Sequence, residues 1–140
     1  MSLINGSNGQ PYERHELNQF GNIEWRPQSF LVIGDPLVAE SLPEGILFLP
    51  WVSAGSDHDI QNGNPDGVRL TDGEETLDSM SYGGVIETLT EGEIGAPDDR
   101  DGMDNLTISR CPHDLDTDNN ASDFRLATAT PGVGNECDEP

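Results

Sequence analysis

The sequence predicts an almost all-β protein, a sandwich or barrel of short strands joined by turns. The apolar runs are short, and the 10 prolines and 16 glycines lie scattered between them instead of gathering in one linker. The longest candidate helix, residues 80–92, is interrupted by Gly83-Gly84 and contains β-branched residues, which favours strand and loop. A chain of 140 residues fits one domain over residues 1–140.

Turn signals predict a first hairpin within residues 3–17, where Asn5-Gly6 and Asn8-Gly9 are both typical of tight turns. Two continuous apolar runs follow, F-L-V-I-G at residues 30–34 and I-L-F-L-P-W at residues 46–51. Runs of this length that contain β-branched and aromatic residues predict strands. Residues 30–34 are expected to be buried on both faces.

The clearest hairpin is predicted for residues 68–82. Two strand-like segments, 68–70 and 76–82, flank the turn-forming residues 72–75, which read D-G-E-E. The side chains expected to face the core are Leu70, Leu77 and either Met80 or Tyr82. Residues 87–105 are polar and acidic with several glycines, so we expect a long surface loop, either a functional one or a solvated insertion.

An acidic segment precedes the last predicted strand. Asp114, Asp116 and Asp118 alternate, a spacing that lets an irregular loop direct several carboxylates at one hard cation such as calcium. The alternative is that these side chains, with Asn119 and Asn120, hydrogen-bond their own backbone in Asx-turns without an ion. Both interpretations place the segment in a loop.

The acidic segment departs from a helix-loop-helix calcium site at two positions. Asn119 stands where such a loop needs glycine, and Arg125 stands where it needs a bidentate glutamate. What remains is a looser candidate calcium site, and no other cofactor is expected. Its ligands would be Asp114, Asp116, Asp118 and Asp123.

The final predicted strand covers residues 124–128, F-R-L-A-T, whose alternation is typical of a half-buried strand. The chain's two cysteines, Cys111 and Cys137, flank this strand and the acidic segment. If they pair, the bridge closes a loop of about 26 residues and stabilises the fold by roughly 3 to 4 kcal/mol. The alternative is two unrelated thiols, which their polar neighbours disfavour.

Charge excludes several classes of partner. The chain carries 27 acidic residues against six arginines and no lysine, a formal net charge of −21. Such a field repels the phosphates of nucleic acids and anionic lipid surfaces, so nucleic-acid binding is disfavoured. Membrane insertion is not expected either, because no apolar stretch reaches the about 18 residues of a membrane-spanning helix.

The compartment follows from the cysteines and the N-terminus. A disulfide indicates an oxidising environment, hence an extracellular or cell-surface location. The first ten residues, M-S-L-I-N-G-S-N-G-Q, lack the basic and apolar regions of a secretion signal. We expect the sequence to be an excerpt of a longer protein, which reconciles the two observations.

Catalysis is not predicted. The three histidines, His15, His58 and His113, lie too far apart in the sequence for a zinc motif. His58 lies between two aspartates, but neighbouring residues on a strand point to opposite faces. The motifs G-x-S-x-G and G-x-G-x-x-G, which carry a nucleophile or bind phosphate groups, are absent from the sequence.

Five segments carry motifs in a fixed order. They are I-Q-N-G-N-P-D-G-V-R-L at 60–70, D-S-M-S-Y-G-G at 78–84, T-I-S-R at 107–110, D-T-D-N-N-A-S-D-F at 116–124 and T-P-G-V-G-N at 130–135. In this order they resemble the lamin-tail domain, specifically its bacterial extracellular branch. The resemblance covers nearly the whole chain and implies an immunoglobulin-like β-sandwich with long acidic loops.

The resemblance also implies a role. It suggests a non-catalytic module of a secreted or surface protein for adhesion, anchoring or protein interaction, with a protein or a surface polymer as ligand. Two alternatives stay open: a calcium-binding stability or recognition module, and an accessory domain of a secreted nuclease or phosphatase. The family's opening strands have no counterpart before Asn5-Gly6, so we expect an N-terminally incomplete domain whose open sheet edge allows self-association.

Overall fold

The fold is built almost entirely from short strands. The computed structural model describes residues 1–20, 26, 28–51, 60–61, 64–98 and 106–137. The strands in these ranges are β1 (Ser2–Asn5), β2 (Gln10–Arg14), β3 (Leu31–Gly34), β4 (Leu47–Pro50), β5 (Asp66–Asp72), β6 (Glu75–Tyr82), β7 (Leu106–Arg110) and β8 (Phe124–Thr128). The helical segments are short turns, η1 (Leu17–Phe20), α1 (Pro36–Ala39) and α2 (Asn120–Asp123). The prediction of an almost all-β chain is confirmed.

The largest sheet has four antiparallel strands in the order β2-β1-β5-β6. The chain between β1 and β2 turns through Gly9, which has a φ of 68°, and Asn5 Oδ1 accepts a hydrogen bond from Ser7 N at 2.8 Å. The chain between β5 and β6 turns at Gly73, with a φ of 59°. Both hairpins lie where the turn signals of the sequence predicted them.

The β5–β6 hairpin does not bury every side chain expected of it. Tyr82 is buried, but Leu77 is 55% exposed, so the expectation that Leu77 faces the core is wrong. Burial increases along β6 from its first residue to its last. Ala96 N donates to Ser81 O at 2.7 Å, so the chain that follows β6 covers its far end, whereas Leu77 lies near the hairpin tip.

The best-buried apolar cluster consists of Ile4, Ile86 and Leu89. Leu89 lies directly over Gly67 of β5, where a Cβ atom would stand 2.6 Å from Leu89 Cδ1. Residues 87–98 form a loop as predicted, without a named helix or strand, and residues 92–94 are exposed, but Leu89 and Ala96 are buried, so part of this loop belongs to the core and not to the surface. Residues 99–105 of the same predicted loop lie outside the described residues.

Strands β3 and β4 form a parallel pair with α1 between them in the chain. Asp35 caps α1, because its Oδ1 accepts a hydrogen bond from Leu37 N at 2.8 Å. All four residues of β3 are only half-buried, so the expectation of burial on both faces is wrong. A sheet of two strands gives neither strand the flanking neighbours that bury the central strands of larger sheets.

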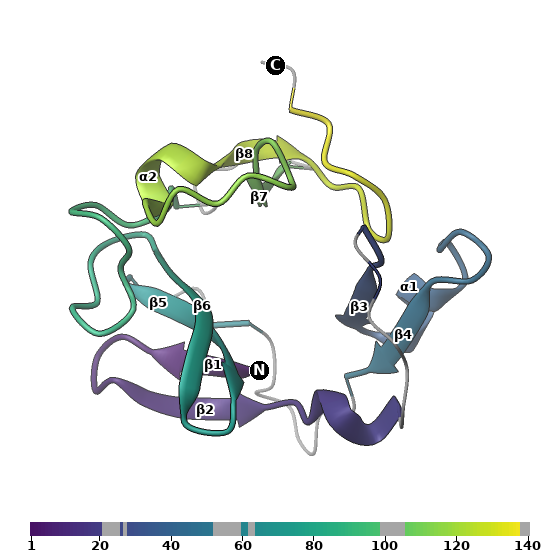
Figure 1. The fold of residues 1–140 in the computed structure, drawn as a ribbon, viewed down its shortest axis with the longest axis horizontal. Helices are drawn as coiled ribbons and strands as arrows, with labels where there is room; N and C mark the ends of the chain where they lie inside the picture. Colours follow the sequence, from purple (N-terminus) through teal and green to yellow (C-terminus); the bar gives the residue numbers. More distant parts are fainter. Residues whose placement is uncertain (21–25, 27, 52–59, 62–63, 99–105, 138–140) are drawn as a thin grey trace.

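Strands β7 and β8 form an antiparallel pair, and β8 confirms the strand predicted at residues 124–128. In Figure 1 the tail that follows β8, residues 129–137, runs down toward β3 and then turns back up toward the C-terminus. Gly132 of this tail contacts the segment before β4: a Cβ on it would lie 3.1 Å from Ile46 Cγ1 and 3.5 Å from Leu42 Cδ2. The tail thus connects the β7–β8 pair with the β3–β4 pair.

Candidate functional site

A dense group of charges surrounds Arg110, the last residue of β7. Its Nη2 atom contacts both carboxylate oxygens of Asp78 on β6, at 2.9 and 2.8 Å. Its Nη1 atom lies 2.9 Å from Asp116 Oδ1 and 3.5 Å from Asp123 Oδ2. The guanidinium also lies over the ring of Phe124, 4.6 Å from its centroid. Arg110 of β7 therefore links β6, the acidic segment and the start of β8.

The structure separates the four predicted calcium ligands into two kinds. Asp114 and Asp118 are exposed, and Asp118 has a φ of 53°, with its N–H donating to Asp116 Oδ1 at 3.2 Å in an Asx-turn. Asp123 is buried: its Oδ1 accepts from Thr117 Oγ1 at 2.6 Å, and its Oδ2 accepts from Thr117 N at 2.9 Å. Asp116 and Asp123 share Arg110 as their cation.

The calcium site stays a prediction. Among the described residues there is no group of three His, Cys, Asp or Glu side chains arranged to hold a metal ion. The Asx-turn interpretation has a direct counterpart in the hydrogen bond between residues 118 and 116. Arg110 was missed as a site residue, although a lone cation four residues before an acidic segment was visible in the sequence.

The carboxyl groups of this cluster differ in their pKa. Burial raises the pKa of Asp123, but hydrogen bonds from Thr117 and Asn119 and the charge of Arg110 outweigh it, so the pKa lies below its ordinary value. Burial raises the pKa of Asp78 above its ordinary value in spite of the Arg110 charge. Burial likewise raises the pKa of Glu91. The cluster holds more carboxylates than its one guanidinium compensates.

Asn120 joins α2 to the four-stranded sheet. Its side chain is fully buried and uses all four of its hydrogen-bonding positions. Its Oδ1 accepts from Ser81 N at 3.1 Å and from Glu91 N at 3.2 Å. Its Nδ2 donates to Ser79 O at 3.1 Å and to Glu91 Oε2 at 3.1 Å. The sequence predicted only local turn bonds for this residue, because nothing local indicates partners 29 to 41 residues away.

Asn119 behaves as the turn interpretation expects. Its Oδ1 accepts a hydrogen bond from Ser122 N at 3.2 Å, so it caps α2. Two neighbouring asparagines of the same segment therefore have different roles, one local and one long-range.

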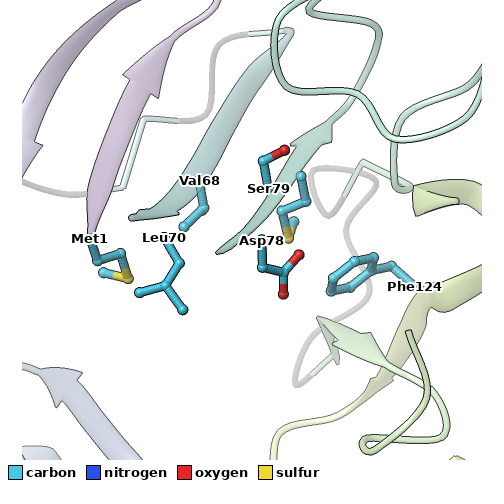
Figure 2. Close-up of a pocket in the computed structure, with 7 residues that line it drawn as sticks. Met1, Val68, Leu70, Asp78, Ser79 and Phe124 are labelled. Carbon is cyan, nitrogen blue, oxygen red and sulfur yellow. The ribbon is translucent and has the colours of Figure 1, made fainter. Parts of the chain in front are cut away.

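A small pocket of about 140 Å³ lies beside the Arg110 cluster, between β5, β6 and the start of β8. Its wall is mainly apolar, formed by Met1, Val68, Leu70, Met80 and Phe124, with Asp78 and Ser79 as the polar members. Figure 2 shows the carboxylate of Asp78 and the ring of Phe124 facing each other across this space. The Asp78 side chain is 37% exposed, so a ligand in the pocket can reach it from solvent.

A second polar cluster connects residue 61 to the four-stranded sheet. Gln61 N donates to the Tyr12 hydroxyl at 3.1 Å, and the Tyr82 hydroxyl donates to Gln61 O at 3.0 Å. Asp66 is buried nearby and accepts from Gly6 N at 2.9 Å. Burial raises the pKa of Tyr12 above its ordinary value. These contacts fasten a loop to the sheet.

Cys111 and Cys137 form the predicted disulfide, with their Cα atoms 5.5 Å apart. Of the three histidines, His15 contacts Trp51 edge to face at 5.1 Å between ring centroids, and His113 lies 6.2 Å from Phe30. His58 and the aspartates beside it lie outside the described residues. The disulfide prediction is confirmed.

Comparisons of the chain with protein-family models, with curated proteins and with solved structures find no match. In the part of the chain that the structure describes, no helix is long and apolar enough to cross a membrane.

Proposed function

We propose that this chain is a non-catalytic interaction module of lamin-tail type, folded as an immunoglobulin-like β-sandwich and working outside the cell or at its surface. The observation that carries this proposal is the Cys111–Cys137 disulfide in an all-β chain. Disulfides persist in oxidising compartments, and short β-domains stapled in this way are common in secreted and surface proteins.

The polar clusters support a structural use of the acidic segment. Asp116 and Asp123 bind Arg110, and Asn120 fastens α2 to β6. The groups with the most suggestive chemistry in the sequence therefore serve to hold elements together. Binding of a partner, rather than conversion of a substrate, is the function that this arrangement favours.

The partner that we propose is a protein or a surface polymer. The net charge of −21 opposes nucleic acids and anionic lipids. A second copy of the chain is a further candidate, because β2 forms one edge of the four-stranded sheet. Light scattering over a range of concentrations tests that case, and a strict monomer would contradict it.

Binding to surface material tests the proposed function directly. Fluorescently labelled chain should bind saturably to isolated cell-envelope material, and excess unlabelled chain should displace it. The control is the same chain after reduction and heat unfolding, which should not bind in a displaceable manner. Absence of displaceable binding by the folded chain, or turnover of phosphate esters or nucleic acids by it, would contradict the proposal.

Calcium dependence is the alternative role. The exposed carboxylates of Asp114 and Asp118 flank Asp116 in one loop, which gives an ion access without displacing Asp123. Calorimetric titration and thermal unfolding at millimolar calcium test it, with magnesium as the control ion. No heat and no change in the unfolding temperature would remove this alternative.

A further inference from the structure

Among the described residues, the charge around Arg110 is incompletely balanced. One guanidinium contacts the carboxylates of Asp78, Asp116 and Asp123. Two of these side chains are accessible to solvent, with exposed fractions of 37% for Asp78 and 47% for Asp116. The cluster therefore presents excess negative charge on its outer side, and an additional cation there would be attracted.

The apolar pocket opens beside this excess charge, and Asp78 belongs to both. Apart from Ser79, the rest of its wall is apolar, formed by Met1, by Val68 and Leu70 on β5, by Met80 on β6 and by Phe124 on β8. Its volume of about 140 Å³ equals that of roughly five water molecules. This is the space of one long side chain, not that of a helix or a strand.

We propose that the pocket is a docking site for one basic side chain, lysine or arginine, of a partner protein. The aliphatic stem would lie against Leu70 and Met80, and the charged end would reach the carboxylates of Asp78 and Asp116. Long basic side chains bury their stems along apolar surface while the charge stays near solvent or a counter-ion. The pocket thus makes the proposed interaction role more specific, because it selects a partner protein that presents a basic side chain. This inference rests on the interaction role proposed above.

Charge complementarity decides against a second copy of this chain as the occupant. The chain has only six basic side chains, all arginine, against 27 acidic residues, and two copies that each carry a net charge of −21 repel one another. The negative charge that repels a second copy attracts a basic partner.

Three matched probe peptides test the chemistry. The first alternates lysine with serine, the second replaces lysine by diaminopropionic acid, which keeps the charge but shortens the stem, and the third replaces it by glutamate. Fluorescence anisotropy at about 0.15 M salt, where exposed charges are largely screened, should show binding of the lysine peptide. The short-stem peptide should bind at least about tenfold more weakly, because its stem leaves the pocket empty.

Two Leu→Lys variants test the location. Leu70→Lys supplies the pocket with a stem and a cation of its own and should weaken lysine-peptide binding by at least about tenfold. Leu77→Lys makes the same change of charge at an exposed position on the neighbouring strand, and should leave binding within about twofold. Equal losses in the two variants would show an effect of net charge only and would overturn the pocket.

A second pair covers the case in which Leu70→Lys fails to fold. Asp116→Asn removes a carboxylate at the cluster, and Asp72→Asn removes one at the exposed tip of the β5–β6 hairpin. Only Asp116→Asn should weaken the binding of the lysine peptide, by about threefold or more; equal effects overturn the pocket. The envelope-binding experiment tests the interaction role separately. If the chain binds envelope material but not the lysine peptide, the pocket proposal is wrong and the proposed interaction role stands.

Discussion

At the scale of single residues, buried polar side chains hold this chain together across long sequence distances. Arg110 connects Asp78 of β6 to the acidic segment, and Asn120 connects α2 to β6 and to Glu91. A buried polar group stabilises only when its hydrogen bonds are complete, and these residues complete theirs with distant partners.

Removing the Asn120 side chain should therefore be costly. Asn120→Ala leaves Ser81 N, Glu91 N and Ser79 O without their partner, and each buried unpaired group costs about 1 to 3 kcal/mol. We expect a loss of at least about 3 kcal/mol in the free energy of unfolding, measured by urea denaturation.

Asn119→Ala is the matched control for that variant. It removes only the cap of a four-residue helix, for which a loss of about 1 kcal/mol is expected. If the two alanine variants lose the same stability, the long-range role of Asn120 is wrong.

Asp123 should make stability depend on pH in the acid range. Its pKa in the folded protein lies below the ordinary 3.8, so the folded state favours the ionised carboxylate. A lowered folded-state pKa gives stability that is present above pH 3.8 and is lost as the pH falls through the folded-state value. Asp123→Asn can still accept the bond from Thr117 N, and its amide N–H can donate to the Thr117 hydroxyl, but it cannot titrate.

The measurement is urea unfolding of the native chain and of Asp123→Asn across a pH series. The native chain should be the more stable at neutral pH, by about 1 to 3 kcal/mol, and this difference should shrink below pH 3.8. A difference that stays constant down to the acid end would count against a lowered pKa of Asp123 in the folded protein.

At the scale of elements, the close approach of Leu89 to β5 explains why residue 67 is a glycine. A Cβ on Gly67 would stand 2.6 Å from Leu89 Cδ1 and 2.7 Å from Met80 O, and the second of these is backbone. Gly67→Ala should thus displace the segment that carries Leu89 and cost about 1 to 3 kcal/mol.

Gly34→Ala provides the comparison on β3. The nearest atom to its added Cβ would be Val38 Cγ2 at 3.8 Å, an ordinary contact. We expect this variant to unfold at nearly the native urea concentration, with a gain of at most about 1 kcal/mol. An equal loss in both variants would mean that the contact between Leu89 and β5 is not the cause.

Prediction from sequence succeeded best for elements whose cause is local. The Asn5-Gly6, Asn8-Gly9 and Asp72-Gly73 pairs form their turns from a few neighbouring residues, so the hairpins appear where expected. Burial was harder to predict, since it depends on which distant segment covers a strand. Leu77 was expected in the core and is exposed, whereas Leu89 belongs to a predicted surface loop and is buried.

At the scale of the whole molecule, the C-terminal tail ties separate sheets to one another. The disulfide fixes Cys137 beside the end of β7, and Gly132 packs against Ile46 next to β4. Asn135 Nδ2 adds a hydrogen bond to Arg110 O at 2.8 Å. The β3–β4 pair thus depends on a segment that is far from it in sequence.

Replacing both cysteines by serine should release that segment. We expect the Cys111→Ser/Cys137→Ser variant to lose about 3 to 4 kcal/mol of stability, from the greater freedom of its unfolded chain. Limited proteolysis should cleave residues 129–137 before the rest of the variant, whereas the oxidised native chain should resist. Native chain treated with a dithiol reductant should behave like the variant, and equal resistance of all three forms would contradict the role of the tail.

The all-β class, the two hairpins, the last strand, the disulfide and the acidic charge can all be predicted without the fold, because each follows from neighbouring residues, from two cysteines or from a sum over the chain. The contacts of Asp116 and Asp123 with Arg110, and the long-range bonds of Asn120, become visible only in the folded chain. Carboxylates and amides suit turns, ions and ion pairs equally well, so their role depends on the partners that folding brings within hydrogen-bonding distance.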